Sequence, residues 1–328
     1  MMRRFSLALM TVVSFIAVFA PATAAQDSFP SRDINLVVTY SPGGGFDSIA
    51  RAIARSMTKG MPKGLNVIVK NITGAAGVRG TTALYRSKPD GHTIAHLDVQ
   101  GLIGNQLLRG GKVGYDMGKM TWLARVGFEP VGIMVNAKSA YHTVDDLRKA
   151  KTLKWGVLAI GGPIWQQSFV AAKALGLPFS GVVSGYRGNS ETIPALLRGD
   201  FDAIATVPVS PAVLPLVRDK EIRVPVVLGK KRYATLPDVP TAKEATGTEF
   251  LIGVIRAIAA PPGLPADRAK VLERLLVNAM ADADYRDFLK KSGQPLVPGN
   301  AAETKELVAL AQGTVEKYSA AMAKAMGR

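Results

Sequence analysis

The chain of 328 residues contains no cysteine. This absence excludes disulfide bonds, a thiol nucleophile and zinc–thiolate coordination. It also excludes the lipid-anchored class of exported binding protein, whose first mature residue is a cysteine. Histidine is scarce too, with only His92, His96 and His142. His92 and His96 would lie too far apart along a predicted strand to share a metal ion easily, so we expect no metal site.

The sequence motifs of common enzymes and nucleotide-binding proteins are absent as well. There is no G-x-x-x-x-G-K-[ST] phosphate loop, no G-x-G-x-x-G dinucleotide fingerprint, no G-x-S-x-G elbow and no H-E-x-x-H zinc motif. Asp200 and Asp202 follow Arg198-Gly199 and indicate the end of a helix more simply than an acid–base pair. We therefore expect the chain to bind rather than to react, without a cofactor.

Acidic residues are outnumbered by basic ones, 25 to 41, which gives a formal net charge of +16. A strong positive field attracts anions, whether small carboxylates, nucleic acid or an anionic membrane surface. The lysines and arginines are scattered, however, and no long basic run is present. We therefore expect no nucleic-acid binding and interpret most of these charges as a solvated surface.

The first residues have the layout of a secretory signal peptide, residues 1–24. Arg3 and Arg4 precede a nearly continuous apolar run from Phe5 to Ala20, and Ala22-Thr23-Ala24 is an A-x-A cleavage site. We expect cleavage near Ala24 and a periplasmic location. The mature chain is long enough for two domains, and no later segment is apolar enough to span a bilayer.

A glycine-rich stretch, Tyr40-Ser41-Pro42-Gly43-Gly44-Gly45-Phe46-Asp47, follows the apolar run from Ile34 to Thr39. Apolar residues then recur at helical spacing up to Met57. A strand, a glycine turn and a helix start in succession form a cradle for a carboxylate or phosphate, because backbone N–H groups can approach the ligand there. The alternative is an ordinary connection in an α/β domain.

A second unit of the same kind lies later in the chain. Trp155 to Ala159 is a predicted strand, Ile160 to Pro163 is a turn, and a helix is expected from about Ile164 to Leu175. Strands alternating with helices predict an α/β protein with parallel sheets and helices on both faces. The last third is expected to be mainly helical, at Ala266 to Ala281, Tyr285 to Lys291 and Thr304 to Ala323.

The first glycine stretch, with Ala50-Arg51, resembles the G-G-x-x-D-x-x-A-R signature of the Bug (TctC-like) family. The resemblance continues through most of the chain, at Asn71 to Gly77, Lys88 to Gly91, Tyr186 to Gly188, Leu236 to Thr241 with Glu244-Ala245, and Ala260 to Pro265. It implies a two-lobed type II periplasmic-binding-protein fold with two crossovers between the lobes. Lobe one is expected at 27–126 plus 232–328, and lobe two at 127–231.

The resemblance also implies a function. Members of this family are extracytoplasmic solute receptors of tripartite tricarboxylate transporters, and they bind carboxylates between the lobes. We expect a monomer that presents a small organic carboxylate to the membrane subunits of such a transporter. The expected ligand-binding residues come from the two glycine loops, the opposite wall and the rim: Tyr40, Ser41, Gly43, Gly44, Gly45, Phe46, Asp47, Gln100, Ala159, Ile160, Gly161, Gly162, Trp165, Tyr186, Gly188 and Thr206.

The second loop departs from the family, in which it is commonly rich in serine and glycine. This chain has Leu158-Ala159-Ile160-Gly161-Gly162-Pro163-Ile164-Trp165 instead. We therefore hypothesise a ligand with one carboxylate on the Gly43–Asp47 loop and an apolar or aromatic body near Phe46 and Trp165. The alternative is that Trp165 is a core residue. Asp47 would hold a water, a ligand hydroxyl or a backbone N–H, because it would repel a carboxylate.

Two other functions are compatible with the same scaffold. The protein could be a ligand sensor that signals to a membrane kinase, or an enzyme such as a deaminase or lyase. A porphobilinogen-deaminase-like enzyme is excluded, because it needs a cysteine for its cofactor.

Overall fold

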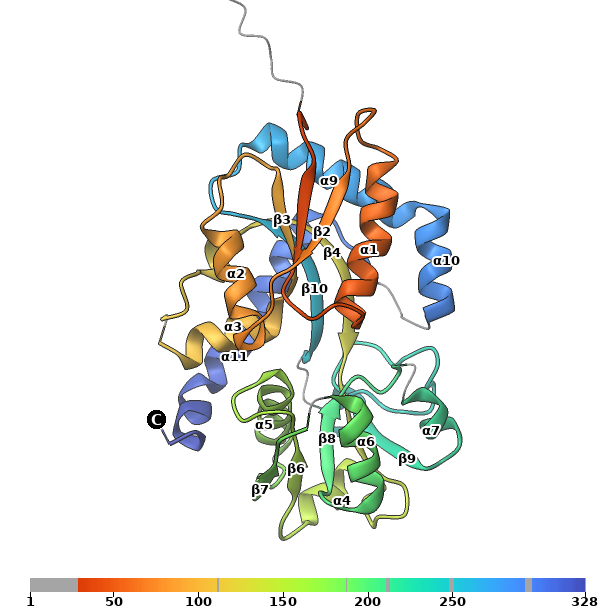
Figure 1. Ribbon diagram of the computed structural model, residues 1–328. Coiled ribbons are helices and arrows are strands. Elements are labelled where there is room, and N and C mark those ends of the chain that lie inside the picture. Colours follow the sequence, from red (N-terminus) through yellow and green to blue (C-terminus); the bar gives the residue numbers. More distant parts are fainter. Residues whose placement is uncertain are drawn as a thin grey trace, which may run out of the picture.

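The computed structural model describes residues 29–110, 112–186, 188–210, 213–247, 251–292 and 297–327. The predicted signal peptide lies outside these residues. The described chain forms two halves, one above the other in Figure 1, each built around its own five-stranded sheet. No helix within the described ranges is long and apolar enough to cross a membrane.

The first sheet has the strand order β2-β1-β3-β10-β4. β1 (Ile34–Val38) runs parallel to β2 (Val67–Asn71) and to β3 (Thr93–Asp98). β10 (Gly253–Ala260) is antiparallel to both β3 and β4 (Thr121–Pro130). The sheet is therefore mixed, not purely parallel as we predicted. Parallel neighbours need a crossover helix, whereas β10 enters directly from the other half of the molecule.

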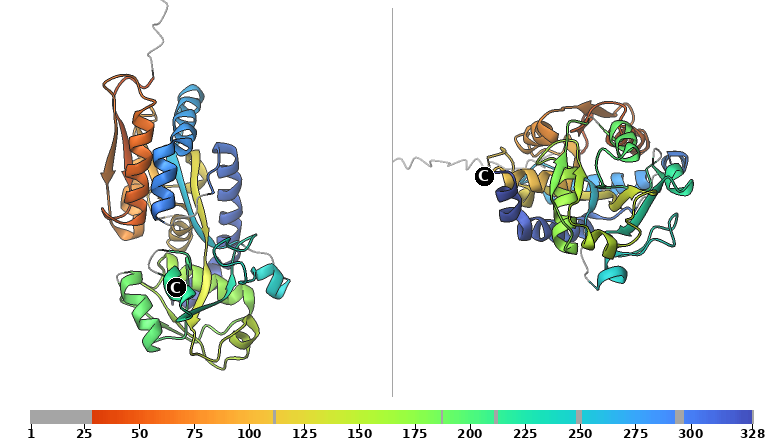
Figure 2. Two further views of the ribbon diagram at one scale, coloured as in Figure 1. Left: turned by 90° about the vertical axis from the view of Figure 1, so that its right-hand side faces the viewer. Right: turned by 90° about the horizontal axis from the view of Figure 1, so that it is seen from below.

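Helices cover both faces of this sheet. Alternate β1 residues Ile34, Leu36 and Val38 share one core with the first set of helices, while Val37 belongs to the core on the other face. Figures 1 and 2 show the two layers. The first face carries α1 (Gly45–Thr58), α9 (Ala266–Ala281) and α10 (Ala283–Ser292), and the second carries α2 (Val78–Tyr85), α3 (Val99–Leu108) and α11 (Ala301–Ala325).

The second sheet has the order β7-β6-β8-β5-β9 and is also mixed. β6 runs parallel to β7 and β8, whereas β5 is antiparallel to β8 and β9. β5 is the equivalent of β10 in this sheet: it is an antiparallel strand that comes directly from the other sheet. The elements of this half are β5 (Gly132–Asn136), α4 (Val144–Lys149), β6 (Lys154–Gly156), α5 (Pro163–Leu175), β7 (Gly181–Val183), α6 (Asn189–Arg198), β8 (Ala203–Thr206), α7 (Leu214–Arg218), β9 (Ile222–Val227) and α8 (Ala242–Thr246).

Two chain crossings join the sheets, and they lie side by side. Val131 donates its N–H to Ile252 O (3.0 Å), Leu228 donates to Val131 O (2.8 Å), and Ile252 donates to Leu228 O (3.0 Å). Thr241 bridges to Val227 of β9, so the segment around α8, which we assigned to lobe one, packs on the second sheet. We therefore propose that lobe two extends to about Ile252.

The two halves also touch away from these crossings. α11 packs along β4 and α3 and ends beside α5 in the lower half (Figure 1). A methyl group on Gly104 of α3 would overlap the Gln166 side chain of α5, and one on Gly161 would lie 2.7 Å from Met326 Cε. Glycine at these positions therefore permits the close approach of α3, α5 and the end of α11. One hydrophobic core runs continuously through this contact.

Candidate functional site

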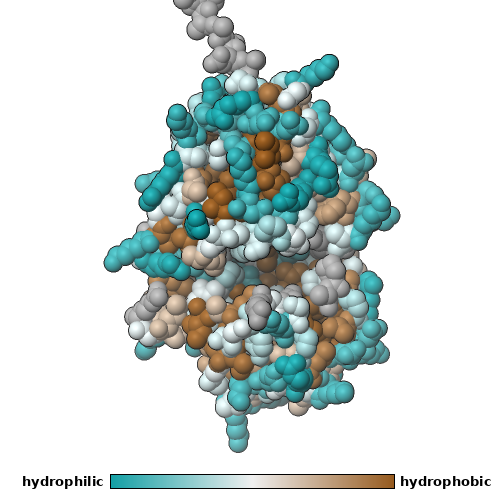
Figure 3. Space-filling view, in the orientation of Figure 1, coloured by the Kyte–Doolittle hydropathy of each residue, from teal (hydrophilic) through white to brown (hydrophobic). Residues whose placement is uncertain are grey.

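The two glycine loops predicted to bind a ligand follow strands that end toward the space between the two halves. Parallel strands of an α/β sheet carry binding loops at their carboxyl ends, and β1, β2 and β3 above and β6, β7 and β8 below end toward the same space (Figure 1). Figure 3 shows the surface hollowed there, with edges that are mostly white, the colour of residues of intermediate hydropathy. We call this hollow the interlobe cleft.

The first loop is formed by Ser41 to Gly45, all exposed. Gly43 has φ +80°, a conformation that glycine adopts without strain, and Gly44 is the N-cap of α1. Within the described chain no side chain caps this helix. The N–H groups of its first turn therefore remain available to a ligand, and the helix dipole favours an anion there.

Asp47 fixes the shape of this loop. Asp47 is 2% exposed, and its carboxylate accepts hydrogen bonds from Gly43 N (2.9 Å), Arg51 Nε (2.8 Å) and Asn71 Nδ2 (2.9 Å). The Arg51 bond in particular holds the pKa of Asp47 at about 2, well below its ordinary value. Asp47 was expected to hold a water, a ligand hydroxyl or a backbone N–H, and the structure shows that it holds the backbone N–H of Gly43. The charge is turned inward and neutralised, so it does not oppose an anion in front of the loop.

Phe46 positions the first turn of α1 against the sheet. Its ring stacks on Tyr40 (centroids 4.5 Å apart), and its carbonyl accepts a hydrogen bond from His96 Nδ1 (3.1 Å), which must carry the proton because a carbonyl can only accept. Burial lowers the pKa of His96 to about 3, so this imidazole is neutral. The Arg256 guanidinium lies 4.1 Å from the centroid of the Phe46 ring.

Asp98 is a second buried carboxyl beneath the loop. It accepts a hydrogen bond from Tyr40 Oη (3.0 Å), caps α3 through Gly101 N (3.4 Å), and faces Arg256 across the β3–β10 pair. Burial raises the pKa of Asp98 and also that of Tyr40. Tyr40 thus acts behind the loop, holding Phe46 and Asp98.

A further loop follows β2, and we did not include it among the predicted ligand residues. Gly74, Ala75, Ala76 and Gly77 have φ values of +126°, +50°, +53° and +90°. Two alanines in the left-handed region are strained, and such strain concentrates at functional sites. Asn71, just before this loop, binds both the Tyr40 carbonyl and Asp47. The signal in the sequence was Asn71 to Gly77, which we had used only for the resemblance.

The second glycine loop offers less to an anion than the first. Gly162 is the N-cap of α5, but its N–H is used by Ala159 O (3.1 Å), and Pro163 has no N–H. Gly161 has φ +77° and accepts a hydrogen bond from Gln166 Nε2 (2.9 Å). Ala159 is exposed and Ile160 is 56% exposed. This loop therefore presents an aliphatic surface with few donors.

Trp165 does not line the cleft. It is 1% exposed and stacks on Phe169 (5.2 Å between ring centroids) within the core of the lower half. This is the core position that we considered as the alternative. Trp165 is near the start of α5, but its position on the helix turns the ring inward.

Of the remaining predicted residues, three lie in the lower half and Gln100 lies in the upper half. Gly188 is the N-cap of α6, and Tyr186 just before it is half-buried against Phe201 (5.9 Å). Thr206 ends β8 and is 6% exposed. Gln100 was expected at the rim, but it is 5% exposed and its side-chain oxygen accepts a hydrogen bond from Gly253 N (2.9 Å), beside the second crossing.

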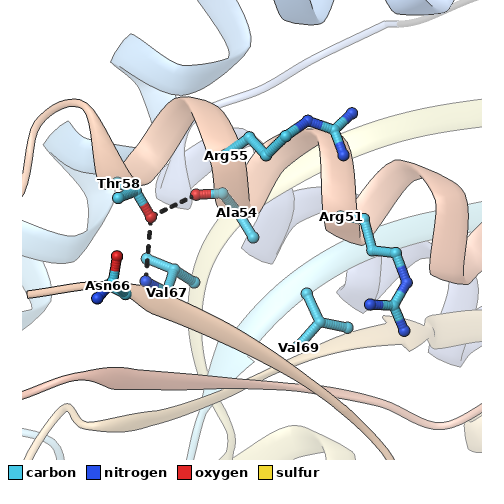
Figure 4. A pocket seen from close by; sticks show the side chains of 7 residues that line it. All are labelled: Arg51, Ala54, Arg55, Thr58, Asn66, Val67 and Val69. Atoms are coloured by element: carbon cyan, nitrogen blue, oxygen red, sulfur yellow. Dashed lines mark hydrogen bonds between the residues drawn. The ribbon is translucent and has the colours of Figure 1, made fainter.

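Another hollow, of about 430 Å³, lies on the outside of α1 against β2 (Figure 4). Arg51 and Arg55 border it, and Thr58 Oγ1 there donates to Ala54 O and accepts from Val67 N. These bonds tie the end of α1 to the start of β2, far from the glycine loop.

Among the residues that the structure describes, no group of three or more histidines or acidic residues could hold a metal ion.

The family follows from a match that covers most of the chain. The model described as "Tripartite tricarboxylate transporter family receptor", TctC, matches residues 49–327. The chain belongs to the TctC family. Among its relatives, the UPF0065 protein in the gbd 5′ region of Cupriavidus necator is 30% identical over 281 residues, which are 83% of this chain and 81% of that one.

Solved TctC-type structures have the same fold. A TctC solute-binding protein from Polaromonas, without ligand, has a TM-score of 0.75 at 25% identity, covering 88% of this chain and 100% of that one. Two Rhodopseudomonas palustris proteins also match, MatC with bound malate (TM-score 0.66, 23% identity, 88% and 100% covered) and one solved with adipate (0.69, 24%, 90% and 98%). The predicted family and two-lobed α/β fold are thus confirmed, and this TctC chain is a solute-binding receptor by family.

Proposed function

We propose that this protein captures a small organic carboxylate in the interlobe cleft, in the periplasm, and presents it to the membrane subunits of a tripartite tricarboxylate-type transporter. The observation that supports the proposal is the uncapped first turn of α1 beside the exposed loop Ser41 to Gly45, with the Asp47 carboxylate already bound by Gly43 N and Arg51 Nε. An anion placed there gains hydrogen bonds and the helix dipole without meeting a free carboxylate. The protein acts by binding, not by catalysis.

The two loops differ, and this difference supports a ligand with one carboxylate and an apolar body. The related proteins solved with malate and adipate hold dicarboxylates. Here the loop before α5 has Ile160 exposed and Pro163 without an N–H. A second carboxylate left without a donor would cost about 1–3 kcal/mol, or roughly a five- to 150-fold loss of affinity. The apolar body would lie toward Ile160, since the Trp165 ring is buried.

Ligand capture would work by closure of the lobes. A ligand that contacts both loops binds the closed state more tightly than the open state and shifts the population toward it. The adjacent crossings at Val131, Leu228 and Ile252 would absorb the rotation, as hinge residues do.

The experiment is calorimetry and thermal shift with the mature chain and four probes: malate, adipate, hexanoate and phenylacetate. We expect hexanoate or phenylacetate to bind most tightly and to raise the unfolding temperature, since a ligand of the folded state stabilises it. Tighter binding of malate or adipate would overturn the monocarboxylate specificity. No binding by any probe would overturn carboxylate capture by this cleft.

A matched set of variants at Gly44 separates binding from folding. Gly44 has φ −77°, and a side chain there meets only Ser41 O at 3.6 Å. Gly44→Asp supplies the missing cap, so it should keep or raise stability while a fixed negative charge expels the ligand. Gly44→Asn supplies a neutral cap and should weaken binding less, and Gly44→Ala should weaken it least. Equal affinities in all three would contradict an anion at this helix end.

A further inference from the structure

Arg256 carries a charge that is nearly buried, and none of the roles described for the two glycine loops depends on it. It lies on β10 opposite Asp98 of β3, at the end of the sheet nearest the cleft, and its side chain is 12% exposed. Its Nε donates to Glu129 Oε2 at 2.6 Å, and its buried Nη1 finds no hydrogen-bond partner among the residues the structure describes. A buried ion pair is weak evidence for stability, because desolvation offsets the attraction. Its position therefore calls for another role.

One side of Arg256 holds the ligand loop. The guanidinium lies over the Phe46 ring at 4.1 Å, and the same ring stacks on Tyr40. Phe46 is the second residue of α1, so its N–H belongs to the first turn that faces the cleft. Attraction between a guanidinium and an aromatic face strengthens when both are shielded from water. Arg256 thus contacts a side chain of that first turn.

The other side of Arg256 reaches the crossings. Glu129 is 6% exposed and precedes Pro130, the last residue of β4, directly before Val131. Arg256 itself is four residues past Ile252, which accepts the hydrogen bond from Val131. The ion pair therefore ties together the strands of lobe one that lead into both crossings, where backbone torsions would change on closure.

We propose that Arg256 is a positioning residue for ligand binding, which couples the first turn of α1 to the crossings through Phe46 on one side and Glu129 on the other. The predicted effect of Arg256 on ligand affinity rests on the carboxylate function proposed above, whereas its predicted effect on the order of residues 44–47 does not. Arg256 acts through Phe46 and needs no contact with the ligand.

Hydrogen exchange of the ligand-free protein tests the positioning directly. Arg256→Met should speed exchange of the amides at residues 44–47 by about tenfold or more, since local opening becomes easier. Arg256→Lys can keep the pair with Glu129 but not the flat stack on Phe46, so it should also speed exchange there. The matched control is Arg223→Met, because Arg223 is also an arginine on a strand and partly shielded from solvent, but it binds carbonyls of residues 137, 139 and 141 in lobe two. Unchanged exchange at 44–47 in Arg256→Met, or an equal rise in the control, would overturn the proposal.

A double-mutant cycle tests the route to the ligand. Arg256→Met and Phe46→Leu are made singly and together, and the affinity for the tightest of malate, adipate, hexanoate and phenylacetate is measured by calorimetry. If Arg256 acts through Phe46, each single change lowers affinity about tenfold and the double variant loses little more. Additive losses would refute this route. If none of the four probes binds, the carboxylate function fails while the exchange result still decides the positioning role.

Discussion

Replacing Asp47 by asparagine removes the charge that fixes the first loop while keeping the size of the side chain. Asp47 accepts three hydrogen bonds, from Gly43, Arg51 and Asn71. The amide that replaces one carboxylate oxygen is a donor, so at least one of these three donors loses its acceptor. The loop should loosen, and ligand affinity should fall because the first-turn N–H groups are no longer held in place.

The loss of stability in this variant can be sized from the pKa of Asp47. A fall of this pKa from 3.8 to about 2 corresponds to roughly 2.4 kcal/mol of folding free energy for a fully shielded group. The Arg51 side chain is 46% exposed, so solvent screening reduces the contribution to about 1–2 kcal/mol. Because the folded-state pKa is lowered, this stabilisation is complete above the unfolded-state value and disappears as the pH falls through about 2.

The assay is urea unfolding of the natural protein and of Asp47→Asn between pH 7 and pH 3. We expect the natural protein to be more stable by about 1–2 kcal/mol at pH 7, with a gap about 1 kcal/mol smaller at pH 3. Glu244→Gln is a control: Glu244 likewise accepts a backbone N–H beside a helix start and pairs with an arginine, but it lies on α8, so its loss should not affect ligand binding. A gap that is constant from pH 7 to pH 3, or unchanged ligand affinity in Asp47→Asn, would refute the reasoning.

Three further changes test other parts of the structure. Trp165→Ala should lower the free energy of unfolding in urea by about 3–5 kcal/mol. At a low temperature, where the variant stays folded, its affinity for the four carboxylate probes should be unchanged; a selective loss of phenylacetate binding would place the Trp165 ring in the cleft. Gly104→Ala should displace Gln166 and cost about 1–3 kcal/mol; Gln166→Ala in the same chain should restore most of it, and failure to restore would argue against this contact. Asp98→Asn should gain stability relative to the natural protein as the pH rises above 4, because ionising a carboxyl with a raised pKa costs the folded state; parallel urea midpoints from pH 4 to pH 8 would contradict this.

Local patterns in the sequence predicted the local structure well. The helix predicted at Ala266 to Ala281 is α9 with the same bounds, and the glycine turns before α1 and α5 lie where they were expected. Spacing and turn chemistry decide such features within a few residues. The family and its two-lobed fold could also be predicted, since several short motifs of the family occur in the sequence in the right order.

Features that depend on distant residues could not be predicted in this way. The position of β10 between β3 and β4 makes the first sheet mixed, and no local pattern reveals a strand's partner. Trp165 faces the core because of its rotation on α5, which a loop alignment does not show. Gln100 and Arg256 gain their roles from partners more than 100 positions away, Gly253 and Glu129.

The place of β10 also affects the order in which the chain can fold. Asp98 and Arg256 face each other across β3 and β10 but are roughly 160 positions apart, and pairing of such distant segments is slow. Of the strands that the structure describes, β4 pairs only with β10 in this sheet, so the sheet stays two separate pieces until β10, near the start of the last quarter of the chain, has been synthesised. With the periplasmic location proposed above, this delay would keep the chain unfolded for longer before it crosses the membrane. The strand that completes the binding lobe is thus also the one that postpones its folding.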